Sequence, residues 1–125
     1  MYSNGYNAYK ANSVNYASKE QLLLMLVDGA VKFSKIARQA MQDNDIKKAH
    51  QAIIKTEDIF TELRASLDVS AGEWAVQMFQ IYGFINDKLM EANIKKDIKV
   101  IDEIIPLIQD IRDIWYEAEK KSKLK

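Results

Sequence analysis

Apolar residues recur along most of this chain in alternating steps of three and four positions, which is the spacing of one face of an α-helix. Four such stripes follow one another from residue 18 onward, and turn-forming residues such as Asp43, Asn44 and Asp45 separate them. The stripes therefore predict four helices that share one core. In chain order, the expected core positions are Leu22, Leu26, Gly29, Phe33, Ile36 and Ala40; Ile46, Ala49, Ile53, Thr56, Phe60, Leu63 and Leu67; Trp74, Met78, Ile81, Ile85 and Leu89; and Ile101, Ile104, Ile108, Ile111, Trp115 and Ala118.

The predicted helix ends carry capping signals. Ser18 with Gln21, and Ser70 with Glu73, have the spacing of a capping box, in which each side chain bonds the backbone N–H of the other residue. Pro106 lies inside the last stripe, and because proline removes one helical hydrogen bond we expect a kink or a break there. The expected helices span about 18–43, 45–67, 71–93 and 97–122.

The short connections between these stretches determine the predicted topology. Connections of about two to six residues make neighbouring helices run antiparallel. The predicted fold is all-α, an antiparallel up-down-up-down four-helix bundle in a single domain over residues 18–125. Residues 1–17 have no helical or strand period, so we expect an extended or partly helical N-terminal tail there.

Composition excludes several classes of function. The 18 Lys and Arg residues balance 18 Asp and Glu residues, and a chain without net charge is poorly suited to nonspecific nucleic-acid binding or to an anionic membrane surface. No apolar run approaches the ~20 residues needed for membrane insertion. There are no cysteines, and we expect no cofactor and no metal. The absence of a secretory signal pattern agrees with a cytoplasmic protein.

The single histidine, His50, raises one enzymatic alternative. An exposed histidine on a helical bundle is the feature of a phosphotransfer domain, but such a site usually has Lys and Gly close behind the histidine. Here the next Lys is Lys55 and no Gly follows. A di-iron bundle needs two Glu-x-x-His motifs, and Lys47 stands where one carboxylate would be required. We therefore interpret His50 as a solvated helix position and expect no catalysis, while the phosphotransfer alternative stays open to test.

Two segments are more apolar than one core stripe requires. Residues 22–27 are apolar on all sides of the predicted helix, and residues 74–86 contain no charge. Either these helices are central or covered by a second copy of the chain, as in a structural homo-oligomer, or they form a groove for another polypeptide. In the second case, the tyrosines of the N-terminal tail are suited to cover the empty groove.

The residues around these segments resemble the FliS family of flagellin export chaperones. The resemblance includes the motif from Ala17-Ser18 to Leu24-Met-Leu-Val-Asp-Gly29, together with 6–10, 62–68, 89–94 and 112–115, and it covers nearly the whole chain in order. Two positions depart from the family pattern. Lys19 stands where proline is usual, and Val27 stands where tyrosine is usual, so this chain lacks the ring and the hydroxyl of that tyrosine.

The resemblance implies a cytoplasmic chaperone that holds the C-terminal helical segment of flagellin, prevents premature polymerisation and aids delivery to the flagellar type III export gate. The unliganded chain could also form a homodimer. From the apolar excess, we expect the flagellin segment to lie along the first and third helices, and the tail either to compete with it or to support it. The candidate contact residues are Tyr6, Tyr9, Tyr16, Leu22, Leu23, Met25, Leu26, Phe79 and Tyr82.

Overall fold

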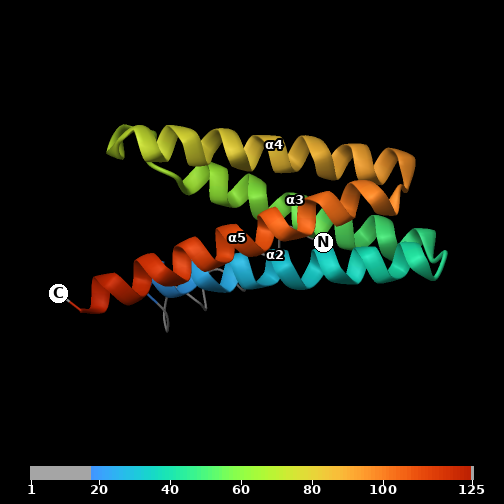
Figure 1. Cartoon of the computed structure of the whole chain (residues 1–125), viewed down its shortest axis with the longest axis horizontal. Helices are drawn as coiled ribbons and strands as arrows, with labels where there is room; N and C mark the ends of the chain where they lie inside the picture. Colours follow the sequence, from blue (N-terminus) through green and yellow to red (C-terminus); the bar gives the residue numbers. More distant parts are fainter. Residues whose placement is uncertain (1–17, 125) are drawn as a thin grey trace, which may run out of the picture.

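The computed structural model describes residues 18–124, which form four long α-helices and one short 3-10 helix, and no strand within that range (Figure 1). The predicted all-α fold is therefore confirmed. The predicted tail, residues 1–17, lies outside the described residues. With the labels of Figure 1, the elements are α2 (Lys19–Gln42), α3 (Ile46–Ser66), η1 (Val69–Ala71), α4 (Glu73–Lys95) and α5 (Ile98–Lys123).

The four helices form a ring in which each one packs against two others. α2 contacts α3 and α5, and α4 also contacts α3 and α5. Figure 1 shows that successive helices run in opposite directions, so the starts of α2 and α4 lie at the same end of the molecule as the ends of α3 and α5. The predicted up-down-up-down four-helix bundle is confirmed.

The core confirms most of the second and fourth stripes. All their expected positions are buried except four near the helix ends: Ile46 and Ala118 are exposed, and Leu67 and Trp115 are half-buried. The prediction was wrong for Ile46 and Ala118 because a residue at the end of a helix has no neighbouring helix to cover it. Fully buried isoleucines such as Ile101, Ile104 and Ile108 form much of the centre of the bundle.

The first stripe was predicted about one residue out of register, and the third stripe was only partly right. In α2, Phe33 and Ile36 are only half-buried, whereas the small residues Ala30, Ser34 and Ala37 are fully buried. In α4, Met78, Ile85 and Leu89 are buried as predicted, but Trp74 and Ile81 are exposed. In α2, two adjacent stripes have the spacing of three and four, and close helix packing selects the stripe with smaller residues. The buried positions are Val27, Ala30, Val31, Ser34, Ala37, Ala40 and Met41 in α2, and Ala75, Met78, Tyr82, Ile85, Leu89 and Ala92 in α4.

One of the two capping boxes is confirmed and the other is wrong. Ser18 Oγ accepts a hydrogen bond from the Gln21 N–H at 3.2 Å, and the Ser18 N–H donates to Gln21 Oε1 at 3.0 Å. Ser70, by contrast, lies inside η1, and α4 begins after Gly72 without a side-chain cap. Gly72 has a φ of +150°, a backbone conformation that favours glycine, and this turn separates Ser70 from the helix.

Pro106 lies within α5, which continues without interruption from Ile98 to Lys123. The expected break is therefore absent. Pro106 is on the exposed face of the helix. The backbone carbonyl that loses its N–H partner there can bond water, which lowers the cost of proline in the helix interior. Within residues 18–124, no helix is both long enough and apolar enough to cross a membrane.

Candidate functional site

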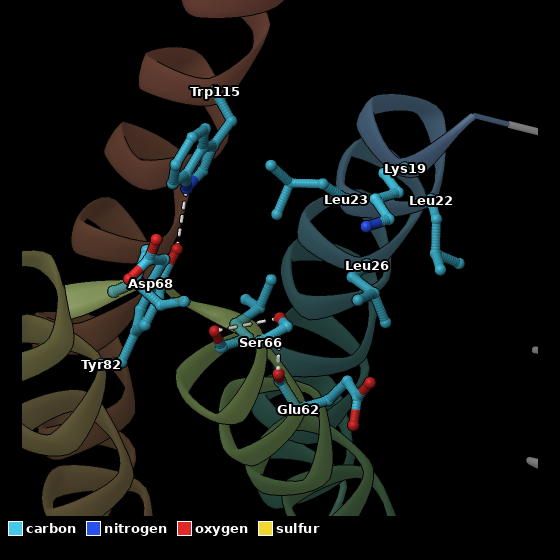
Figure 2. A pocket seen from close by; sticks show the side chains of 11 residues that line it. Lys19, Leu22, Leu23, Leu26, Glu62, Ser66, Asp68, Tyr82 and Trp115 are labelled. Atoms are coloured by element: carbon cyan, nitrogen blue, oxygen red, sulfur yellow. Dashed lines mark hydrogen bonds between the residues drawn. The ribbon is translucent and has the colours of Figure 1, made fainter. Parts of the chain in front are cut away.

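A pocket of about 390 Å³ opens at the end of the bundle where α2 begins and α3 ends. Its volume lies within the range of ordinary ligand pockets, and its walls are mostly apolar. All four long helices contribute to it (Figure 2). The lining residues are Lys19, Leu22, Leu23, Leu26, Glu62, Leu63, Ser66, Leu67, Asp68, Tyr82 and Trp115.

Leucines from α2 form one wall of the pocket. Leu22, Leu23 and Leu26 are half-buried, and Val27, at the end of the same apolar run, is buried in the core. Figure 2 shows the α2 leucines across the pocket from Trp115 and Tyr82. The apolar excess of residues 22–27 thus has a structural explanation, because one face of the helix faces the core and the next face borders the pocket.

A hydrogen-bonded aromatic pair forms the opposite wall. The Trp115 indole N–H donates to the Tyr82 hydroxyl oxygen at 2.8 Å and so links α5 to α4. Tyr82 is only 1% exposed, and burial raises its pKa to about 12. The ring of Phe60 lies 5.8 Å from that of Tyr82, and the ring of Trp74 lies 6.1 Å from that of Trp115 in an edge-on contact. These contacts on both sides hold the wall in place.

Polar groups surround the opening. Lys19 comes from the first turn of α2, Glu62 and Ser66 from the last turns of α3, and Asp68 from the segment that follows. The Ser66 hydroxyl donates to the Glu62 carbonyl at 2.9 Å. Asp68 accepts hydrogen bonds from the Ser70 hydroxyl and N–H, which lower the pKa of Asp68 below its usual value. An apolar floor with a polar rim is the composition of a binding surface for an amphipathic segment.

The structure brings some of the predicted contact residues together and leaves others apart. Leu22, Leu23, Leu26 and Tyr82 line the pocket, although the fully buried Tyr82 presents only part of its side chain. Met25 is 40% exposed on α2 and is not among the lining residues. The predicted residues Tyr6, Tyr9 and Tyr16 lie outside the described residues.

Phe79 is likewise outside the pocket. It lies on α4, and the Arg64 guanidinium of α3 is stacked 4.0 Å from the centre of its ring. The same guanidinium fills the space beside Gly83, where an added Cβ would come within 2.9 Å of Arg64 Nη2. The uncharged stretch 74–86 therefore contributes Tyr82 to the pocket, while Trp74, Val76, Ile81 and Phe84 are exposed elsewhere on α4.

Sequence reasoning missed much of the pocket. Leu63, Leu67 and Trp115 were predicted only as core positions, and α3 was not expected to form a wall. The available signal was the position of these residues near helix ends, where neighbouring helices no longer cover the apolar stripe. The motifs at 62–68 and 112–115 that carry the family resemblance contain all three residues, so the resemblance indicated their importance without indicating their role.

His50 lies near the other end of the bundle, close to the start of α3. Its side chain is exposed, and its Nδ1 lies 3.0 Å from the Asn93 amide nitrogen of α4. Lys96 also reaches this group, since its Nζ donates to Asn93 Oδ1 at 2.7 Å. Among residues 18–124, no cluster of histidine and carboxylate side chains is arranged to hold a metal ion. His50 thus pairs with a neutral amide on a solvated surface.

Comparison with known proteins gives consistent matches. The model of the family described as flagellar protein FliS matches residues 2–122. The flagellar secretion chaperone FliS of Bacillus subtilis is 36% identical over 92% of this chain and 86% of its own length, and that of Escherichia coli is 31% identical over 86% and 80%. A solved structure described as a flagellar chaperone from bacteria has a TM-score of 0.75 over 97% of this chain and 99% of its own. At 16% identity, that structure supports the fold.

Proposed function

Because this chain belongs to the FliS family of flagellar secretion chaperones, we propose that its leucine-lined pocket holds the C-terminal helical segment of flagellin. The family is one of chaperones and not of enzymes, which agrees with the expected lack of catalysis. The observation that carries the proposal is the pocket itself, an apolar cavity with a polar rim at one end of the bundle.

The chemistry of the pocket suits one face of an amphipathic helix. Such a helix places large apolar side chains three and four residues apart, and these anchors insert into a groove between other helices. Each fully buried leucine-sized side chain contributes about 1.5–3 kcal/mol. Ordering the bound segment and losing its free motion offset much of this gain, so the complex stays releasable.

Holding flagellin in this way would prevent its premature polymerisation, because the bound apolar face is no longer available to other flagellin subunits. The sequence contains no phosphate-binding glycine loop, so we propose release by handover to the flagellar export gate rather than by nucleotide hydrolysis. The same proposal places the chain in the bacterial cytosol. It leaves the N-terminal tail as either a competitor or a supporting contact, and a homodimer as the state of the unliganded chain.

A pair of leucine variants tests the proposal. Leu23→Ala removes part of the α2 wall, whereas Leu107→Ala changes a 38% exposed leucine of α5 that does not line the pocket. Calorimetric titration with a flagellin C-terminal fragment should show about ten-fold weaker binding for Leu23→Ala, since roughly 1.4 kcal/mol of contact energy is lost. Leu107→Ala should bind like the unmutated chain.

Undetectable binding of the fragment by the unmutated chain would end the proposal. Sedimentation of the same samples addresses the homo-oligomer alternative. A self-association that the fragment does not disturb would assign the pocket to a second copy of the chain.

A further inference from the structure

The hydroxyl group of Tyr82 lies in the wall of the pocket, and among residues 18–124 it is used as a hydrogen-bond acceptor but not as a donor. Its oxygen accepts a hydrogen bond from the Trp115 indole N–H at 2.8 Å. Among residues 18–124, the structure shows no hydrogen bond that the Tyr82 O–H donates. The side chain is 1% exposed, so this donor is withdrawn from bulk solvent.

A buried donor without an acceptor is uncommon, because leaving it unpaired forfeits the hydrogen bond that water would have made. The indole of Trp115 donates only, and it therefore cannot accept the Tyr82 proton. With its pKa raised to about 12, Tyr82 stays protonated and keeps this donor throughout the physiological range. The side chains of α2 that face Tyr82 across the pocket are leucines, which offer no acceptor, and the Asp68 carboxylate accepts its hydrogen bonds from Ser70.

We infer that the Tyr82 hydroxyl is the polar anchor of the pocket and donates a hydrogen bond to a neutral oxygen of the bound segment. That oxygen belongs to a side-chain amide beside the apolar anchors or to a backbone carbonyl at a helix end. The inference rests on the proposed function and adds a specificity determinant to it.

Two features of the site favour a neutral acceptor over a carboxylate. The pocket floor consists of leucines and aromatic rings, and transferring a carboxylate into such surroundings costs far more than one hydrogen bond returns. The one cation among the lining residues, Lys19, is exposed in the first turn of α2, so it does not offset the cost of burying a carboxylate beside Tyr82. In contrast, a backbone carbonyl near the end of a helix has no intrahelical partner and accepts a hydrogen bond without this penalty.

Tyr82→Phe tests the inference, because it keeps the ring and removes only the hydroxyl. Calorimetric titration with the flagellin C-terminal fragment should show about ten-fold weaker binding, since the acceptor of the fragment is left unpaired in the pocket. The matched control is Tyr116→Phe. It removes another interhelical tyrosine hydrogen bond, from Tyr116 to Asp28 at 2.5 Å, away from the pocket lining. It should bind the fragment within two-fold of the unmutated chain.

A second pair of variants tests whether the Tyr82 hydroxyl affects binding directly or only through its hydrogen bond with Trp115. Trp115→Phe removes the indole N–H, so in this background the Tyr82 hydroxyl has no internal partner. Adding Tyr82→Phe to Trp115→Phe should still weaken binding about ten-fold relative to Trp115→Phe alone. This comparison also remains valid if Tyr82→Phe by itself folds poorly, since removing both partners of a buried hydrogen bond is often nearly neutral for stability.

The outcomes distinguish this inference from the proposed function. If the unmutated chain binds the fragment and both Tyr82→Phe steps change the affinity by less than two-fold, the anchor is excluded while the pocket remains the binding site. Equal weakening by Tyr82→Phe and Tyr116→Phe would also overturn the anchor, because the effect would then be a general loss of rigidity. Absence of binding by the unmutated chain would remove the proposed function itself.

Discussion

The two ends of the bundle are built differently. At the end where α2 meets α3 and α4 meets α5, connections of only a few residues join the helices, and small buried residues such as Ala37, Ala49 and Ala92 let them pack closely. At the other end, α2 begins and α5 ends without a connection between them, and leucines and aromatic rings line a pocket instead of filling it. We refer to these as the closed end and the pocket end.

This difference explains where a bundle can bind a partner. Short turns and small residues draw helices together and leave no room between them. Within residues 18–124, large side chains near the start of α2 and the end of α5 have neighbours on one side only, so they leave a cavity that another chain can fill. The closed end therefore stabilises the fold, and the pocket end offers apolar surface. Three substitutions test this division, beginning with the largest expected effect.

Ile101→Asp should unfold the protein. Ile101 is fully buried in α5 toward the closed end. An unpaired carboxylate there costs several kcal/mol, against a total stability of about 5–15 kcal/mol. Thermal unfolding followed by circular dichroism should show loss of the cooperative helical transition. Ile114→Asp, on the exposed face of the same helix, should melt close to the unmutated chain. An unchanged melting curve for Ile101→Asp would show that the closed end does not carry the stability.

Met25→Asp should reduce flagellin affinity more than it reduces thermal stability. Met25 is exposed on α2 beside the pocket leucines, so its change costs little in the free protein but places a charge beside a bound apolar segment. Calorimetry and melting on the same sample separate the two effects. Met90→Asp, an exposed methionine on α4, is the control. Equal affinity for Met25→Asp and the unmutated chain would confine the binding surface to the pocket.

His50→Ala should have the smallest effect. His50 is exposed near the closed end and contacts the neutral Asn93 amide, and such surface substitutions usually change stability by less than about 0.5 kcal/mol. Melting and fragment binding should both remain close to those of the unmutated chain. Incubation with a phosphodonor followed by mass spectrometry should find no phosphohistidine. Phosphorylation, or a large loss of function in His50→Ala, would favour the phosphotransfer alternative.

Local sequence signals predicted well where the helices lie, and less well which face of each helix is buried. Ser18, Asp45 and Asp97 cap helices through bonds to nearby backbone N–H groups, and such signals can be read within a few residues of sequence. Ser70 has the same signal but lies in a 3-10 turn, because Gly72 redirects the chain after it. The rotation of α2 depended on which of two adjacent stripes allowed close packing, and that choice involves residues from other helices.

The candidate site shows the same division. Leu22, Leu23 and Leu26 could be proposed from sequence because an apolar run exceeded the needs of one core stripe. Trp115 could not be assigned to the pocket, because its spacing is that of a core residue. Its place opposite those leucines follows from the packing of α5 beside α2 and from its hydrogen bond to Tyr82.

The chain by itself determined the four helices, their antiparallel order and the family, because periodicity, caps, short connections and motifs act over short stretches of sequence. Only the tertiary structure decided that the pocket lies among all four long helices at one end of the bundle, and that Tyr82 and Trp115, 33 residues apart in the chain, meet there. The physical reason is that a pocket is the space which packed side chains leave unfilled, and this space depends on residues from all four helices together.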